Sequence, residues 1–290
     1  MSCNACVARC VSEYIDKFAL QSGSNFHNRN TSIMPIFRGQ ADKSWDLLPS
    51  IYRNDRFEFE TIYLKELERI CPDEFFGLSY IEKMIKMQHH GLPTRLLDFS
   101  LNPLVALYFA CKEIFDTDGV VYAIHGFPMH PENFIWTSIV TKAIFEYTLT
   151  NFSFEEFIRD LQQDPLNYPC HDVEPFYTKA QIKKILTNPI GIYPKLNNSR
   201  LRNQDGVFVL FGMCLSGSTH GKSRFDKVTY KTPTVLSKHT QICYIPAEHK
   251  EKILCELDHL GINERKLFPD IDNLAKYIPS FFKNRTERIV

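Results

Sequence analysis

Apolar residues recur along the chain at two spacings, and each spacing predicts a different element. In residues 57–70, the side chains of Phe59, Tyr63, Leu67 and Ile70 fall on one stripe at helical spacing, which predicts an amphipathic helix. Similar patterns and end signals predict helices at about residues 8–20, 79–89, 103–115, 249–260 and 272–282.

Short apolar runs bounded by glycine or turn residues predict buried strands. Two such runs, residues 94–98 and 119–126, flank the helix predicted at 103–115 and form a strand–helix–strand unit with it. Asn102 and Pro103 suit the N-cap and first turn of that helix, which is apolar on nearly every side and is therefore expected inside the protein. Further strands are expected at residues 32–39, 206–212 and 241–245.

The chain has 290 residues, of which 44% are hydrophobic, and it contains no repeat, low-complexity tract or long linker. This pattern favours one continuous α/β (α+β) domain with elaborations. We expect an N-terminal helix in residues 1–24 and the domain itself over residues 25–285. Within it, residues 128–195 are irregular to helical and rich in aromatic side chains, and they are interpreted as an insertion or lid.

The net charge and the apolar content of the chain limit which partners and which cellular compartment are expected. The 34 basic and 34 acidic residues cancel, so the whole chain has no electrostatic bias toward nucleic acid or an anionic membrane. The longest apolar run, residues 103–111, is about half of a membrane span, and the N-terminus lacks the basic and apolar segments of a secretory signal. We therefore expect a cytoplasmic protein without a membrane partner.

Nine cysteines, an odd number scattered along the chain, indicate reduced thiols rather than a disulfide framework. The spacing of Cys3, Cys6 and Cys10 would suit a metal site, but a fourth ligand is not evident, and the same spacing suits one face of a helix. We expect no metal.

The stretch from residue 87 to 111 places polar groups directly before the apolar helix. Arg95 and Asp98 lie on the predicted strand, and because an unpaired buried charge costs several kcal/mol, both are expected to be paired. A structural ion pair and a ligand contact are both open readings. Ser100 and Asn102 follow near the helix N-terminus, a position that suits an anion or a ribose as well as an ordinary cap.

Two further segments carry polar groups at strand ends. In Phe37-Arg38-Gly39-Gln40, the arginine ends an early strand and the glycine permits close backbone approach, which suits bidentate phosphate binding, although a surface turn is the simpler reading. In residues 200–208, a glutamine and an aspartate enter a predicted strand, where side chains face a cleft.

His89 ends a predicted helix and precedes a Gly-Leu-Pro turn. It is interpreted either as a ligand contact or general acid/base, or as a histidine that closes the helix through a backbone hydrogen bond. The polar group His171, Asp172 and Glu174 lies in the variable insertion and is a weaker catalytic hypothesis.

Taken in order, these segments resemble the FRG domain family, which is named for its Phe/Tyr-Arg-Gly motif. The matching motifs are F-R-G-Q with W-x-L-x-P-S at 37–50, Q-H-x-G-L-P-T-R-L-L-D at 88–98, N-P-L-x-A-L-Y-F-A at 102–110, R-x-x-x-Q-x-G-x-F at 200–208 and L-F-P-D at 267–270.

A more distant similarity connects the same residues to ADP-ribosyltransferases, which use an arginine on an early strand, a serine at the end of a second and a glutamate before a later one. Arg38, Ser100 and Gln204 stand in that order here. The resemblance implies a split, strongly bent sheet with helices between the early strands. It also implies that NAD is the substrate and that the acceptor is a macromolecule, either protein or nucleic acid, as in a bacterial toxin or antiphage effector.

The resemblance also implies roles for individual residues. Arg38 would bind the NAD diphosphate or ribose, Ser100 would hold the arginine or the ribose, and Tyr108 or Phe37 would stack on nicotinamide. The residues predicted to act in catalysis are Arg38, Ser100, Gln204, His89 and Asp98. The residues predicted to bind NAD are Arg38, Gly39, Gln40, Thr94, Arg95, Asn102 and Tyr108.

Gln204 departs from the transferase pattern, because an amide holds a ribose hydroxyl but does not take a proton from a nucleophile. Either Asp205 or Asp98 acts as the base, or the site binds a nucleotide without turnover and signals to a partner. The sequence also leaves open whether a partner inhibits the activity. A third reading is RNA binding or processing through Arg38, Arg95, Arg200 and Arg202, against which the neutral net charge argues mildly. The leading hypothesis requires Arg38, Ser100 and Gln204 to share one hollow.

Overall fold

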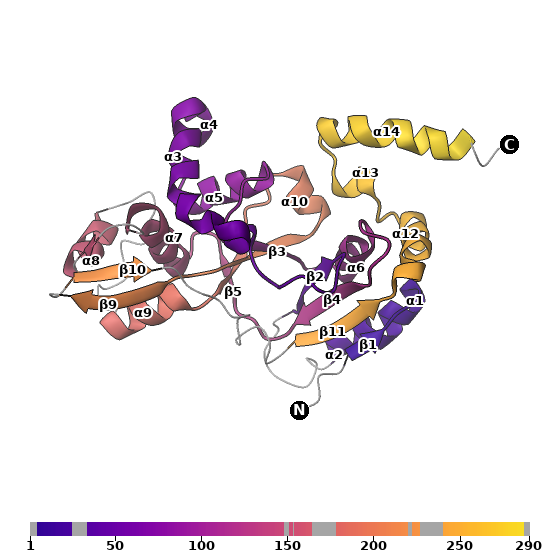
Figure 1. Cartoon of the computed structure of the whole chain (residues 1–290), viewed down its shortest axis with the longest axis horizontal. Helices are drawn as coiled ribbons and strands as arrows, with labels where there is room; N and C mark the ends of the chain where they lie inside the picture. The colour runs from indigo at the N-terminus through magenta and orange to yellow at the C-terminus, as the bar shows by residue number, and fades with distance from the viewer. Residues whose placement is uncertain are drawn as a thin grey trace.

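A mixed eight-stranded sheet forms the centre of the computed structural model, which describes residues 5–24, 34–147, 151–152, 154–163, 178–219, 222–226 and 240–286 (Figure 1). Its strand order is β1-β11-β4-β2-β3-β8-β7-β5, and a second sheet has the order β6-β10-β9. The strands are β1 (Ala5–Val7), β2 (Ile36–Gln40), β3 (Leu96–Ser100), β4 (Gly119–Ile124), β5 (Met129–Pro131), β6 (Asn151–Phe152), β7 (Ile190–Tyr193), β8 (Gly206–Leu210), β9 (Cys214–Thr219), β10 (Lys222–Asp226) and β11 (Thr240–Ile245).

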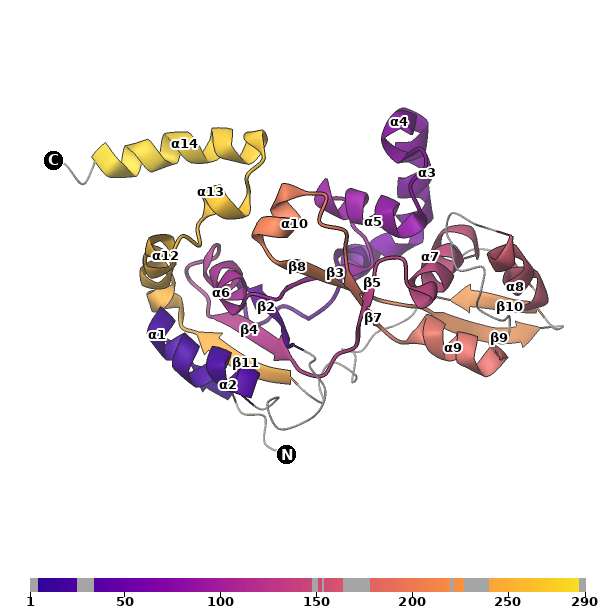
Figure 2. The ribbon, with the colours of Figure 1, turned by 180° about the vertical axis from the view of Figure 1, so that it is seen from behind.

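Helices cover both ends of the large sheet. Figure 2 shows α1, α6 and α12 gathered at one end, while α7, α8 and α9 lie beside the small sheet at the other. The helices are α1 (Val11–Tyr14), η1 (Ile15–Ala19), α2 (Leu20–Ser24), η2 (Ser50–Phe59), α3 (Glu60–Ile70), α4 (Pro72–Phe75), α5 (Tyr80–His89), α6 (Pro103–Cys111), α7 (Ile135–Tyr147), α8 (Phe154–Gln162), α9 (Lys179–Thr187), α10 (Ser199–Asn203), η3 (Ala247–His249), α12 (Lys250–His259), α13 (Glu264–Leu267) and α14 (Ile271–Thr286).

The large sheet opens between β2 and β3. β2 pairs with β4 along its whole length, and β3 pairs with β8 in the same way, both antiparallel. β2 and β3, in contrast, meet only at the pair Phe37 and Ser100. Because the two strands separate beyond this pair, the sheet leaves space at its centre for side chains from both edges.

Helix α6 follows β3 and leads into β4, as the strand–helix–strand pattern predicted. β2 lies between these two strands, so the connection crosses over it. The Asn102 side chain accepts the amide proton of Leu104 at 3.0 Å, which caps the helix as expected. Most of α6 is buried, including Val105 and Leu107, because the helix has apolar side chains all around it.

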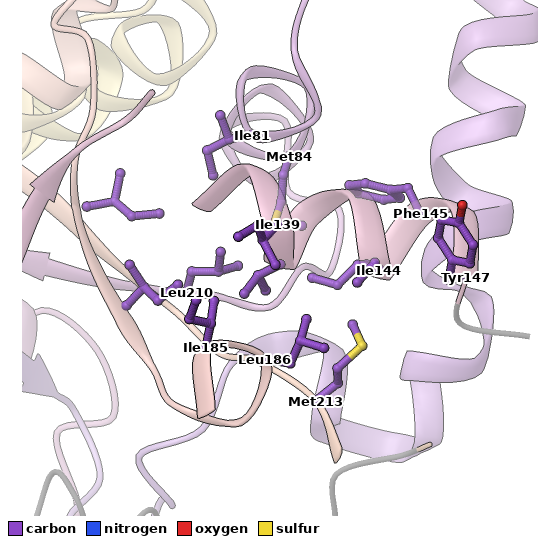
Figure 3. Close-up of a cluster of buried hydrophobic side chains, with 14 of the residues drawn as sticks. Ile81, Met84, Ile139, Ile144, Phe145, Tyr147, Ile185, Leu186, Leu210 and Met213 are labelled. Carbon is purple, nitrogen blue, oxygen red and sulfur yellow. The ribbon is translucent and has the colours of Figure 1, made fainter. Parts of the chain in front are cut away.

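Buried apolar side chains form three clusters. One surrounds α6 and includes Tyr14 and Phe18 from the N-terminal segment. A second lies between β3, β8 and the segment that follows β2. The third surrounds α7, as Figure 3 shows for Ile139, Ile144 and Phe145. The apolar faces of α6 and α7 therefore pack inward, whereas the helix expected at residues 272–282 leaves Ile278 and Phe282 50% and 61% exposed.

The N-terminal segment contains the expected helix but begins with a strand. β1 pairs in parallel with β11 at the edge of the sheet, and Cys6 lies opposite Cys243. Cys10 precedes α1, while Cys3 lies outside the described residues. Within the described part of the chain, no group of three His, Cys, Asp or Glu side chains is arranged to hold a metal ion.

Two sequence predictions need adjustment. The helix expected over residues 57–70 is α-helical only from Glu60, because the preceding residues continue the 3-10 helix η2. Residues 128–195, interpreted as an insertion or lid, include the buried helix α7 and the strands β5 and β7 of the large sheet. These parts belong to the core because their apolar side chains pack inward. His171, Asp172 and Glu174 lie outside the described residues.

None of the helices in the described ranges is both long and apolar enough to cross a membrane.

Candidate functional site

A cavity of about 230 Å³, here called the Arg38 cavity, lies where β2 and β3 separate. Its walls come from both strands, from α6 and from the turn between α10 and β8. The polar and aromatic residues around it include Phe37, Arg38, Gln40, Trp45, Arg53, Asp98, Ser100, Phe109, Lys112, Glu113, Arg200 and Gln204.

Arg38 bridges the opening of the sheet. Its Nη1 donates a hydrogen bond of 2.7 Å to the backbone carbonyl of Asp98 and lies 3.9 Å from the Asp98 carboxylate. The Arg38 side chain is 17% exposed, and its Nε has no hydrogen-bond partner among the described residues. Burial lowers the pKa of Arg38 and the Asp98 charge opposes this, but a guanidinium remains protonated at neutral pH.

Ser100 is a structural link. Its hydroxyl donates to the backbone carbonyl of Gln204 at 2.6 Å and accepts the amide proton of Asn102 at 2.9 Å. It therefore ties the end of β3 to the turn before β8. The contact with Arg38 that the resemblance implied is made by Asp98 instead.

Gln204 caps the C-terminus of α10 and lies two residues before the start of β8. Its side-chain Nε2 donates to the carbonyl of Leu267 at 2.9 Å. Gln204 also lines the Arg38 cavity, together with Arg38 and Ser100. The three residues therefore share one hollow, as the order of the motifs predicted.

Gly39 and Gln40 continue β2 along the cavity wall. A side chain at Gly39 would collide with the backbone of α6 at Ala106, so this glycine permits the strand and helix to pack closely. Gln40 is 2% exposed, and its Nε2 donates to the carbonyl of Asp46 at 3.3 Å. Its Oε1 is buried without a partner among the described residues.

Arg95 is part of a buried ion pair and does not line the cavity. Its Nε lies 2.5 Å from Glu60 Oε2, and its Nη1 donates to the carbonyl of Gly212 at 2.9 Å and to the Tyr52 hydroxyl at 3.2 Å. The side chains of Arg95 and Glu60 are only 3% and 2% exposed. The expectation that Arg95 pairs with a charge is correct, but its partner is Glu60. With its guanidinium occupied inside the core, the assignment of Arg95 to NAD binding has no geometric support.

Three other residues predicted to contact NAD also lie away from the cavity. The Thr94 hydroxyl is buried and donates to Gln88 at 2.6 Å. Asn102 caps α6 and donates to the carboxylate of Asp205 at 3.2 Å. Tyr108 is a buried residue of α6, and this burial raises its pKa. Phe109, the next residue, faces the cavity instead.

A second cavity of about 460 Å³, here called the His89 cavity, adjoins the first. Both are lined by Asp98, Arg200 and Gln204, and the two adjoining cavities together are here called the groove. The His89 ring lies 3.2 Å from the Asn198 amide nitrogen. Burial lowers the pKa of His89, and the nearby charges of His90 and Arg200 lower it further. The Asp98 side chain is 59% exposed and accepts a hydrogen bond of 2.9 Å from Gln88.

Several cavity residues were absent from the sequence-based selection. Trp45 and Arg53 lie within or beside the quoted motifs, so their position could have drawn attention to them, while Arg200 was named only for the alternative of RNA binding. Lys112 follows the apolar helix and carries no local signal of a ligand. Phe109 and Lys112 line the same cavity because they lie three residues apart on one helix face.

The fold and groove define a mixed α/β domain with a ligand-sized, charged groove in the opening of its central sheet. Residues 34–119 match the family model of the FRG domain, so the chain contains an FRG domain. The matched segment supplies β2, β3 and α6, which carry much of the Arg38 cavity. Searches of curated proteins and of solved structures found no match to the chain.

Proposed function

We propose that the groove binds NAD and that the protein transfers ADP-ribose from it to a macromolecular acceptor. The observation that carries this proposal is the charge of the Arg38 cavity. Among the described residues that line it, Arg38, Arg53, Lys112 and Arg200 are cationic, whereas only Asp98 and Glu113 are acidic. A diphosphate carries two negative charges, and guanidinium groups bind phosphate oxygens in a bidentate manner.

The sizes of the two cavities support a ligand that spans them. Sites for small molecules and cofactors usually have volumes of about 300–1,000 Å³. The Arg38 cavity, at about 230 Å³, is smaller than this range, while the His89 cavity, at about 460 Å³, falls within it. A dinucleotide with its diphosphate beside Arg38 would extend past Asp98 into the His89 cavity.

The chemistry requires a carboxylate near the bond that breaks. When nicotinamide leaves, the ribose develops oxocarbenium character, which a nearby negative charge stabilises. Asp98 lines both cavities, whereas the Asp205 carboxylate accepts a hydrogen bond from Asn102 and is not among the lining residues. Of the two carboxylates considered from the sequence, Asp98 is therefore the better placed.

His89 is suited to take a proton from the acceptor. Its lowered pKa means that the imidazole is neutral at pH 7 and able to act as a base. In this scheme the nucleophile of the acceptor attacks the ribose carbon, the bond to nicotinamide breaks, neutral nicotinamide leaves, and His89 receives the proton. Gln204 has no role in proton transfer, since it carries an amide that is bonded to Leu267.

Nucleotide binding without turnover is the second candidate. It is favoured because the side chains of Gln204 and Ser100 already donate hydrogen bonds to backbone carbonyls of the protein. RNA binding through the four arginines is less well supported. Arg95 is buried in its pair with Glu60, and Arg202 donates to the carbonyl of Leu196 at 2.7 Å.

The test measures nicotinamide release from NAD and thermal stabilisation by ADP-ribose for the wild type and Arg38→Ala. Release that is lost in the variant supports the transferase, and stabilisation without release supports the binding module. Arg69→Ala is the matched control, because Arg69 is 70% exposed and lies outside both cavities. If the wild type shows neither effect, or if Arg38→Ala retains both, the proposal is wrong.

A second experiment addresses a toxic or antiphage role. If the protein is a toxic enzyme, its expression in a bacterial host arrests growth, and Arg38→Ala relieves the arrest. Harmless expression of the wild type would argue against this role.

A further inference from the structure

Two cations of the Arg38 cavity lie over the same aromatic ring. The Lys112 Nζ is 4.0 Å and the Arg200 Cζ is 4.8 Å from the ring centroid of Phe268. Phe268 is 6% exposed and is not itself among the residues that line the cavity. It therefore lies behind two side chains that do line it, one at the end of α6 and one on α10.

The segment around Phe268 also contacts the remaining cavity wall. The ring of Phe109 packs edge-on against Phe268, with 5.9 Å between their centroids. The carbonyl of Leu267 accepts the hydrogen bond from Gln204. These two consecutive residues, at the C-terminal end of α13, therefore make direct contact with cavity residues from two separate parts of the chain, the end of α6 and the region of α10.

An aromatic ring orients a cation without neutralising it. Lys112 also has two longer ion pairs, with Nζ 3.8 Å from Glu264 and 4.0 Å from Glu113, but neither carboxylate lies at hydrogen-bond distance. The face of Phe268 attracts the ammonium through its quadrupole and adds no negative charge that would compete with an anionic ligand. Lysine and arginine side chains that are free to rotate lose considerable conformational entropy when they bind a ligand. A pair that is already held in place loses less of this entropy, so binding is more favourable.

We propose that Phe268 is a positioning residue that holds Lys112 and Arg200 for an anionic ligand in the Arg38 cavity. The cavity then presents two pairs of cations, Lys112 with Arg200 and Arg38 with Arg53, from different elements. This arrangement fits a ligand with two linked phosphates, such as the diphosphate of a nucleotide. The inference rests on the proposed nucleotide binding and adds a ligand class and a positioning group to it.

The test is the affinity for ADP-ribose, measured by calorimetry, in Phe268→Leu and Phe268→Tyr. Leucine keeps an apolar side chain but removes the ring face, so affinity is expected to fall by about 3- to 30-fold. Tyrosine keeps the ring and is expected to stay within about 3-fold of the wild type. Inorganic pyrophosphate, used as a second probe, is expected to follow the same order, because the phosphates carry the interaction.

A double-mutant cycle separates positioning from general stability. In a background with Lys112→Met and Arg200→Met, Phe268→Leu should cost no further affinity, because the ring has no cation left to orient. If Phe268→Leu weakens binding as much in that background as in the wild type, the positioning role is wrong. This cycle also remains informative if the leucine variant is less stable, provided that each variant melts well above the assay temperature.

The two proposals fail in different ways. If Arg38→Ala leaves the affinity for ADP-ribose unchanged, the proposed nucleotide binding is wrong. If Arg38→Ala abolishes binding while Phe268→Leu binds like the wild type, the nucleotide site stands and the role of Phe268 is refuted.

Discussion

The buried ion pair between Arg95 and Glu60 is expected to contribute strongly to the stability of the protein, and a single substitution tests this contribution. Glu60→Gln keeps the size of the side chain but removes its charge, and it leaves the guanidinium charged inside the core. The neutral partners of Arg95, among them the Tyr52 hydroxyl and the Gly212 carbonyl, would remain. The protein is therefore expected to lose stability without any change in the groove, which neither member of the pair lines.

The expected loss follows from the burial of both groups. Removing one partner of a buried ion pair usually costs about 3–5 kcal/mol. Two charges about 4 Å apart at an effective dielectric constant of about 20 interact by about 4 kcal/mol, which agrees with that range. Since a domain is stable by only about 5–15 kcal/mol, the substitution should remove about a fifth or more of the free energy of unfolding.

Urea denaturation measures this loss as a lower transition midpoint at an unchanged slope. The control is Glu66→Gln, which breaks the pair with Arg69. That pair also has an N···O distance of 2.5 Å, but its side chains are exposed, and no measurable shift is expected. Adding Arg95→Met to Glu60→Gln should recover most of the stability, because it removes the buried positive charge that Glu60 balanced.

A Glu60→Gln variant within about 1 kcal/mol of the wild type would refute the argument from burial. The alternative taken from the sequence makes the opposite prediction. If Arg95 contacted NAD, Arg95→Met would weaken nucleotide binding in a protein of nearly normal stability.

Three further outcomes are expected. Gly39→Ala should lower the free energy of unfolding by about 2 kcal/mol or more, because the added methyl group overlaps the backbone at Ala106. Urea denaturation measures this loss, and an unchanged transition midpoint would contradict the close packing. Lys250→Met should cost about 2–4 kcal/mol, since it leaves buried carbonyl groups that the ammonium now satisfies, and thermal melting at neutral pH checks this. The imidazole of His89 should titrate by NMR with a pKa below 6.5, and Arg200→Ala should raise that pKa by removing a positive charge. Because the folded pKa lies below the unfolded value, the contribution of His89 to stability is complete above pH 6.5 and is lost as the pH falls through the folded pKa.

Local patterns in the sequence predicted many of the elements. The apolar runs that became β3, β4 and β8 are short and bounded by turn residues, and the run that became α6 begins with an N-cap and a proline. These signals act over a few residues, so they do not depend on the rest of the fold. The predicted boundaries of the helices were less accurate where a 3-10 helix adjoins an α-helix, because apolar residues recur at a similar spacing in both.

The composition of the site was only partly predictable. The order of the motifs correctly predicted that Arg38, Ser100 and Gln204 line one cavity. The individual contacts were not predictable, since they depend on side chains far apart in the chain. Ser100 bonds the backbone of the turn at Gln204, and Arg38 reaches Asp98 because β2 and β3 separate after a single residue pair.

The amino-acid pattern alone established a mixed α/β chain with a buried helix behind a polar strand end, because burial periodicity and capping are properties of neighbouring residues. Tertiary packing determined which charges meet. Arg95 has an acidic residue three positions away, yet it pairs with Glu60 at the start of helix α3, because the two side chains are buried next to each other in the core. Phe268 comes to lie under Lys112 and Arg200 for the same reason: the chain's path through space, and not the spacing of its residues, sets the neighbours of a buried ring.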